Sequence, residues 1–170
     1  DLFFFGTLSD RLYLYDKKKE TIRNLFTALH PNSKFEKLGN TTAITQDNEG
    51  YVWIATNKNG LYRLNRNLKL AKHYQKEDGL SDSYINSLTI DRHENIWVTT
   101  GKSLYKLNRT TDTFSEMKIA DIPAMEFTRF SGNSISADGS IYFPGDKGVL
   151  FFNPDKIMVN PNIPPIYITS

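Results

Sequence analysis

Short apolar runs alternate with polar turns along this chain, and each run has the length of a strand. Within residues 41–75 the pattern predicts four strands, at residues 43–46, 51–56, 61–65 and roughly 69–74. Asp, Asn, Glu and Gly separate these runs, and such residues favour tight turns between antiparallel strands. This part of the chain is therefore expected to form a small four-stranded antiparallel sheet.

The same plan repeats with a period of about 44 residues. Trp97 follows Trp53 by 44 residues, and Tyr142 follows Trp97 by 45. A further, incomplete copy begins at Phe3, with phenylalanine in place of tryptophan. The repeats are expected near residues 1–25, 41–75, 85–118 and 130–155.

A period of this length with four short strands is typical of β-propeller blades, because one small sheet cannot bury both faces alone. We therefore predict an all-β fold, a partial β-propeller of about three and a half four-stranded antiparallel blades. The repeated aromatic rings would lie between blades, where each removes a large apolar area from water. The residues that we expect to have this structural, repeat-defining role are Trp53, Trp97, Tyr142, Thr56 and Thr100.

Two segments depart from the repeat. Ile22, Leu25, Phe26 and Leu29 have the spacing of an amphipathic helix. The repeat register instead favours an outer strand at about residues 21–25 and an insertion at residues 30–40, with a one-turn helix after the strand as an alternative. Residues 156–170 follow Pro154 and are rich in proline, which disfavours a regular helix or a central strand, so we expect an exit segment there.

Composition excludes several classes of function. The 21 Lys and Arg residues nearly balance the 19 Asp and Glu residues, so the net charge of +2 is too small to favour nucleic acid as a partner. The absence of cysteine removes disulfides and thiolate chemistry. No apolar stretch approaches the length of a membrane-spanning helix, and we expect no membrane contact by this segment.

Candidate catalytic groups are scattered. His30, His73 and His93 show no metal-ligand spacing, and the acidic turn residues lack the pattern of a calcium loop. Neither a nucleophile elbow nor a phosphate-binding loop is present. We therefore expect no catalytic residue, no metal and no cofactor in this segment, although a lyase-type or hydrolase-type propeller stays an alternative.

Ligand contacts in repeat scaffolds concentrate on the face where variable loops gather. In this chain that face should combine the turns between second and third strands with the links between blades, at residues 75–84 and 120–129. The candidate ligand-binding residues on it are Lys58, Asn59, Lys102 and Lys147. They would suit a polar or anionic ligand such as a sugar, whereas solvated loop charge is the simpler interpretation.

The repeated motifs resemble the two-component regulator propeller repeats of Bacteroidetes hybrid two-component sensor histidine kinases. The motifs are Asp47-x-x-Gly50-x-x-Trp53-x-x-Thr56, Gly60-Leu61-Tyr62, the inter-blade Asp78-Gly79-Leu80-Ser81, and the final-blade Gly139-x-x-Tyr142-Phe143 with Phe152-Asn153-Pro154-Asp155 and Pro164-Pro165-Ile166-Tyr167-Ile168-Thr169. The chain departs from the family pattern at Pro144 and Asn95, where the family has glycine.

The resemblance implies a non-catalytic sensory segment in the periplasm, responsive to glycans and relaying a signal to a kinase elsewhere in the parent protein. It also implies that residues 156–170 lead into an immunoglobulin-like Y_Y_Y domain. Implied partners are an oligosaccharide and the rest of the sensor chain. A protein-interaction scaffold is the alternative function.

Open blade edges suggest one further partner. Closed propellers have about four to eight blades, so this chain would leave edge surfaces uncovered. We therefore expect self-association, or cover from further chain.

Overall fold

The computed structural model describes residues 1–7, 11–25, 39–117, 125–128 and 132–157. In this part of the chain, strands form two three-stranded and two four-stranded sheets, all antiparallel. The first sheet contains β1 (Leu2–Gly6), β2 (Leu12–Asp16) and β3 (Thr21–Asn24). The second contains β4 (Thr41–Gln46), β5 (Val52–Thr56), β6 (Leu61–Leu64) and β7 (Leu70–Tyr74).

The other two sheets have the same up-and-down order. The third contains β8 (Ser87–Ile90), β9 (Ile96–Thr99), β10 (Leu104–Asn108) and β11 (Thr113–Glu116). The fourth contains β12 (Ser134–Ile135), β13 (Ile141–Gly145) and β14 (Gly148–Phe152). Two short 3₁₀ helices, η1 (Lys76–Asp78) and η2 (Pro154–Lys156), follow the second and fourth sheets.

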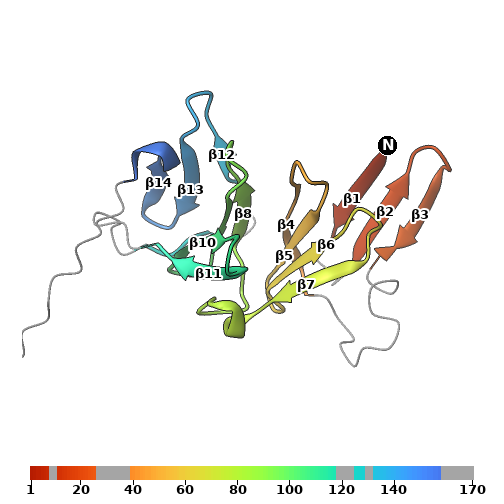
Figure 1. The fold of residues 1–170 in the computed structure, drawn as a ribbon, viewed down its shortest axis with the longest axis horizontal. Coiled ribbons are helices and arrows are strands. Elements are labelled where there is room, and N and C mark those ends of the chain that lie inside the picture. Colours follow the sequence, from red (N-terminus) through yellow and green to blue (C-terminus); the bar gives the residue numbers. More distant parts are fainter. Residues whose placement is uncertain (8–10, 26–38, 118–124, 129–131, 158–170) are drawn as a thin grey trace, which may run out of the picture.

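The sheets stand side by side in sequence order, from β1–β3 at one end to β12–β14 at the other (Figure 1). Their first strands meet, because β1 contacts β4 and β4 contacts β8. Sheets that meet along their first strands and fan outward are the blades of a propeller. The predicted all-β, partial β-propeller is confirmed.

Three apolar clusters fill the spaces between successive sheets. Trp53 of β5 is 1% exposed and packs among residues of β8–β11, including Leu88 and Phe114. Trp97 of β9 is also 1% exposed and packs against Ile141 and other residues of the fourth sheet. A third cluster joins the first two sheets. Blade stacking, and not a single central core, therefore buries the apolar side chains.

Tyr142 occupies a different environment from the two tryptophans. It is half-buried and stacks on Phe151 at a ring separation of 5.7 Å. No further sheet lies beyond it in the described residues. The fourth repeat thus has the aromatic position of a blade, and whether a following blade covers Tyr142 is not tested by the described residues.

The helical spacing near Ile22 is not realised within the described residues. Ile22 lies in β3 and pairs with Tyr15, so the outer strand predicted from repeat register is present. Leu25 is buried against the second sheet. Residues 26–38, and with them most of the expected insertion, lie outside the described residues, as do residues 158–170 of the exit segment.

Gly79 holds the link between the second and third blades in a conformation that other residues adopt poorly. It caps η1 with a φ of 96°, and an added Cβ would lie 2.1 Å from the carbonyl oxygen of Phe114.

We expect Gly79→Ala to lower the free energy of unfolding by about 1–3 kcal/mol, because left-handed strain and a backbone clash act together. Gly101→Ala is the matched control, since a Cβ added at Gly101 would meet no atom within 4 Å. Urea denaturation measures both, and equal stability of the two variants would contradict this role for Gly79.

Candidate functional site

The four candidate residues of the loop face lie on turns of three different sheets. Lys58 and Asn59 lie between β5 and β6, Lys102 between β9 and β10, and Lys147 between β13 and β14. The lysines are exposed, and Lys102 Nζ lies 3.5 Å from a carboxylate oxygen of Glu126. None of the four lines the hollow described below.

The turns and blade links do share one face. The backbone N–H of Gly60 donates to the carbonyl of Ser83 at 2.7 Å, and that of Phe127 donates to the carbonyl of Gly101 at 2.9 Å. The structure thus joins the two loop families, but it distributes the candidate side chains along the face instead of gathering them at one point.

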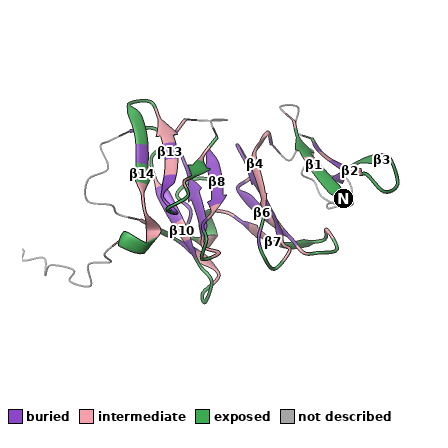
Figure 2. Ribbon diagram, turned by 90° about the horizontal axis from the view of Figure 1, so that it is seen from above, coloured by how far each residue is buried: buried purple, intermediate pink, exposed green. Residues whose placement is uncertain are grey.

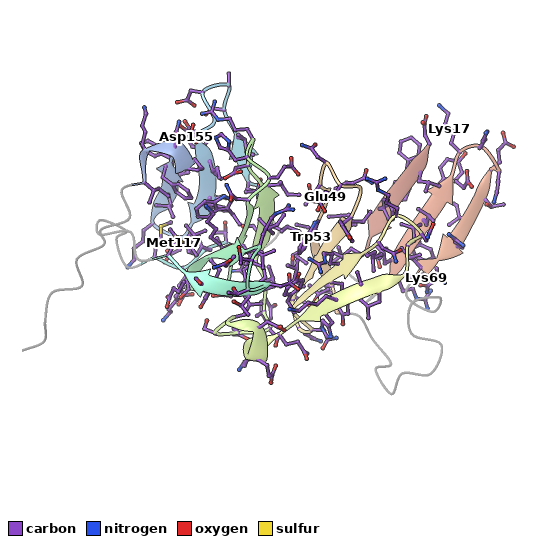
Figure 3. The ribbon with its side chains drawn as sticks, viewed as in Figure 1. Lys17, Glu49, Trp53, Lys69, Met117 and Asp155 are labelled. Atoms are coloured by element: carbon purple, nitrogen blue, oxygen red, sulfur yellow. The ribbon has the colours of Figure 1, made fainter. Side chains whose placement is uncertain are left out.

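A polar hollow lies at the other end of the strands, between the second and third blades. Its volume is about 230 Å³. The residues that line it come from two kinds of turn and from the adjoining strands: Asp47, Glu49, Tyr51, Trp53, Arg63, Leu107, Arg109 and Asp112. Figure 3 labels Glu49 on the turn after β4 and Trp53 on β5. Two arginines, three carboxylates and two aromatic rings therefore converge here.

Arg63 of β6 forms the inner wall of the hollow. Its guanidinium carbon lies 5.3 Å from the ring centre of Tyr51, 5.4 Å from that of Trp53 and 5.6 Å from that of Tyr74. Such contacts stabilise a cation through the negative ring face. Its Nη1 pairs with Asp112 at 3.2 Å, while its buried Nε has no protein partner.

Asp112 connects three side chains of the second blade to the third. It accepts hydrogen bonds from Tyr74 Oη at 2.7 Å and Arg63 at 3.2 Å, and Lys72 Nζ lies 3.1 Å away. Desolvation alone would raise the pKa of Asp112, but the bond from Tyr74 and the two cations lower it overall. Burial, and then the bond to Asp112, raises the pKa of Tyr74.

Arg109 forms the outer rim. Its Nη1 lies 3.2 Å from Glu49, and its Nε donates to the carbonyl of Glu94 at 3.0 Å. The side chains of Arg109 and Glu49 are 38% and 62% exposed, so both can exchange partners with water or a solute. The hollow therefore offers acceptors and donors at its mouth.

An aspartate supports each buried tryptophan. Asp47 accepts from Trp53 Nε1 at 2.9 Å, and Asp91 accepts from Trp97 Nε1 at 2.8 Å. Burial would raise the pKa of Asp91, but the bonds from Trp97 and Asn95 lower it overall. Each aspartate also accepts backbone N–H groups of its own turn. Each aspartate therefore holds both the conformation of its own turn and the orientation of the indole ring.

Acid is expected to destabilise the fold below about pH 4 through Asp91 and Asp112. The pKa of each is lower in the folded chain than its usual 3.8. The unfolded chain therefore binds more protons in this range, and stability that is present above it is lost as pH falls through the folded pKa.

Thermal melts from about pH 7 to about pH 2 measure this effect. Asp91→Asn and Asp112→Asn should each reduce the fall of the melting temperature at low pH. Glu77→Gln, on the exposed surface of η1, should leave that fall unchanged. If both aspartate variants lose as much melting temperature at low pH as the native chain, Asp91 and Asp112 do not cause the acid destabilisation.

The sequence does not predict the hollow, but it contains signals of it. Turn chemistry alone would account for Asp47 and Asp91, yet each precedes its tryptophan by six residues. Arg63 and Lys106 occupy the same repeat position, opposite Trp53 and Trp97 across the hairpin. The same pairing of a basic side chain with a tryptophan in two repeats indicates that the two side chains interact. Asp112 could not be found this way, because its partners come from another blade.

Among the described residues, no three His, Asp or Glu side chains lie close enough together to hold a metal ion. In the same part of the chain, no helix has the length and apolar character needed to cross a membrane. His93, one of the three histidines of the chain, places its Nε2 2.8 Å from a carboxylate oxygen of Asp155.

Several solved structures are similar to this chain. The extracellular domain of BT4673 from B. thetaiotaomicron, described as belonging to a hybrid two component system, aligns with a TM-score of 0.70 and 18% identity, over 91% of this chain and 22% of that chain. PorZ of the type-IX secretion system of Porphyromonas gingivalis aligns with a TM-score of 0.65 and 17% identity, over 89% and 23%. Virginiamycin B lyase from Staphylococcus aureus aligns with a TM-score of 0.58 and 17% identity, over 85% and 49%.

These likenesses show the fold, and the chain spans about a fifth of the length of the BT4673 extracellular domain. No protein of curated function matches the sequence significantly. At the level of sequence, residues 37–58 and 79–102 match the family described as two component regulator propeller. Those segments contain β4 with β5 and β8 with β9, including both Asp–Trp pairs. The chain is therefore a β-propeller segment, of which residues 37–58 and 79–102 match two-component regulator propeller repeats.

Proposed function

We propose that this chain is a non-catalytic, glycan-recognising segment of a two-component sensor, located on the outer side of the cytoplasmic membrane. The observation that carries the proposal is the match to two-component regulator propeller repeats on a propeller fold. The likeness to an extracellular domain of a two component system supports the location.

The hollow between the second and third blades is the ligand site that the geometry favours. Glu49 and Arg109 supply exposed hydrogen-bonding groups at its mouth, and Tyr51 supplies an aromatic edge. A sugar suits this combination, because hydroxyl groups pair with carboxylate and guanidinium while the apolar face of the ring packs on an aromatic residue. The loop face around Lys58 and Lys102 is the second candidate.

A chain of contacts links the hollow to the exit segment. Arg109 donates to the carbonyl of Glu94 in the turn between β8 and β9 at 3.0 Å. In the same turn, Arg92 and His93 each lie 2.8 Å from a carboxylate oxygen of Asp155 in η2. A ligand that draws Arg109 toward itself would alter the turn that holds η2. This supplies a route by which binding favours one arrangement of the following segment.

Calorimetric titration with a panel of neutral and acidic oligosaccharides tests the proposal. We expect binding by the 170-residue chain, loss of binding in Arg109→Gln, and retained binding in the triple variant Lys58→Ala, Lys102→Ala, Lys147→Ala. The reverse pattern would move the site to the loop face. Absence of binding to every oligosaccharide, or turnover of one, would contradict the proposed function.

A further inference from the structure

Two further hollows flank the polar hollow between the second and third blades. One, which we call the Arg66 hollow, has a volume of about 350 Å³ and is lined by Glu49, Tyr51, Asn65, Arg66 and Asn67. The other, which we call the Lys106 hollow, has a volume of about 550 Å³, and its lining includes Asn95, Lys106, Leu107, Asn108 and Arg109. The second and third sheets, which carry these residues, lie side by side, with exposed turns at the ends of their strands (Figure 2).

The three hollows adjoin one another because they share lining residues. Glu49 and Tyr51 line both the Arg66 hollow and the polar hollow. Leu107 and Arg109 line both the polar hollow and the Lys106 hollow. Sites for small molecules usually have about 300–1,000 Å³, so a row of three such hollows suits a chain of several sugar rings better than a single ring. We call this row the groove.

Arg66 and Arg109 occupy the same repeat position at two points of the groove. They lie 43 residues apart, and each directly follows an asparagine at the end of the third strand of its blade. Arg66 Nε donates to the carbonyl of Glu49 at 2.6 Å, and Arg109 Nε donates to the carbonyl of Glu94 at 3.0 Å. The same bond thus holds each guanidinium on the turn between the first two strands of its own blade, and it leaves the terminal nitrogens for other partners.

Two cations of the groove, Arg66 and Lys106, have no carboxylate partner in the part of the chain that the structure describes. Lys106 Nζ instead lies 5.3 Å from the ring centre of Trp97. Arg109 is the third cation, and its partner Glu49 has a side chain that is 62% exposed. Exposed ion pairs contribute little to stability, so the carboxylate of a ligand can replace Glu49 on Arg109.

The other carboxylates that line the groove are already engaged. Asp47 is buried and accepts a hydrogen bond from Trp53. Asp112 pairs with Arg63 and Lys72. The groove therefore presents three cations to a ligand, against the single exposed carboxylate of Glu49.

We propose that the groove binds a linear acidic oligosaccharide, a chain of uronic acid residues whose carboxylates pair with Arg66, Arg109 and Lys106. This inference rests on the glycan recognition proposed above and specifies the class of glycan. A guanidinium binds a carboxylate through two parallel hydrogen bonds, and cations that repeat from blade to blade suit a ligand whose charge also repeats along its length. Tyr51, which lines two of the hollows, offers its ring to the apolar face of a sugar.

Calorimetric titration with matched oligosaccharides tests the inference. The probes are dimers and tetramers of mannuronic acid and of glucuronic acid, together with neutral mannose and glucose oligomers of the same lengths and linkage. Each acidic probe then differs from its neutral counterpart only in carboxylates that replace hydroxymethyl groups. We expect one acidic tetramer to bind at least about tenfold more tightly than its neutral counterpart and than its own dimer, because each carboxylate adds charged hydrogen bonds. Added salt should weaken this binding, since it screens exposed charge.

Substitutions along the groove locate the ligand. Arg66→Gln and Lys106→Gln, in the two outer hollows, should each weaken binding of the acidic tetramer by about tenfold. Glu49→Gln should strengthen it, because Arg109 then has no competing carboxylate at its Nη1. Lys69→Gln is the control and should bind as the native chain does, because Lys69 is exposed on the same turn as Arg66 but lines none of the three hollows (Figure 3).

The outcomes separate this inference from the proposed function. The inference is wrong, while glycan recognition stands, if neutral tetramers bind as tightly as acidic ones or acidic dimers bind as tightly as tetramers. It is equally wrong if the acidic tetramer tolerates either Arg66→Gln or Lys106→Gln, or if Glu49→Gln weakens its binding. Absence of binding to every oligosaccharide would overturn both the inference and the proposed function.

Discussion

Replacement of Trp53 by alanine is expected to lower the free energy of unfolding by about 3–5 kcal/mol. The indole is 1% exposed between the second and third blades, and it stacks on Tyr74 at a ring separation of 5.7 Å. Removing it leaves a cavity and also leaves the buried carboxylate of Asp47 without its indole donor. Guanidinium denaturation with separate fits of midpoint and slope measures the loss.

Trp53→Phe separates the two contributions. Phenylalanine keeps most of the apolar volume but cannot donate to Asp47, so we expect a smaller loss, of about 1–3 kcal/mol, from the unpaired carboxylate oxygen and a minor packing defect. If Trp53→Ala is as stable as the native chain, the indole is not buried between blades.

Asp112→Asn is expected to lower the free energy of unfolding by about 1–3 kcal/mol. Asparagine keeps the size of the side chain and tolerates the positive φ of 53° at this position. It removes the charge that faces Arg63 and Lys72, at 3.2 and 3.1 Å. Arg63 then lacks its counter-charge, while Lys72 keeps only the carboxylate of Asp78, at 3.1 Å; the unpaired Arg63 is the main reason for the loss.

A double-mutant cycle with Arg63→Met tests whether this loss belongs to the inter-blade pair. We expect a coupling energy between the two changes of about 0.5–3 kcal/mol, because residues in direct contact are not additive. Lys69→Met, on an exposed turn of the second blade, is the control and should be additive with Asp112→Asn. Additivity of Arg63→Met and Asp112→Asn would show that the contact contributes nothing measurable.

The repeat made the architecture predictable from the sequence. The spacing of Trp53 and Trp97 set the length of a blade, and the same register identified β3 as a strand despite the helical spacing that includes Ile22 and Leu25. Local periodicity alone would favour a helix here. The repeat carries more information, because a blade is stable only when its neighbours have matching strands.

The candidate site was much less predictable. Loop position singled out Lys58 and Lys102, but position along a strand does not reveal which turns from different blades enclose a hollow. Arg63 and Asp112 lie 49 residues apart in sequence and meet only after two blades pack together. Tyr142 is more exposed than Trp53 and Trp97 for a related reason, since its burial depends on a neighbouring sheet and not on its place in the repeat.

The central claim is that the two tryptophans of this chain, Trp53 and Trp97, lie between stacked blades. Because the chain contains no other tryptophan, its fluorescence reports on these two sites alone, and acrylamide quenching of that fluorescence is the most direct test. Burial between blades predicts blue-shifted emission and weak quenching in the native chain, with a shift to longer wavelength and strong quenching on unfolding. Emission and quenching that match the unfolded chain under native conditions would contradict it.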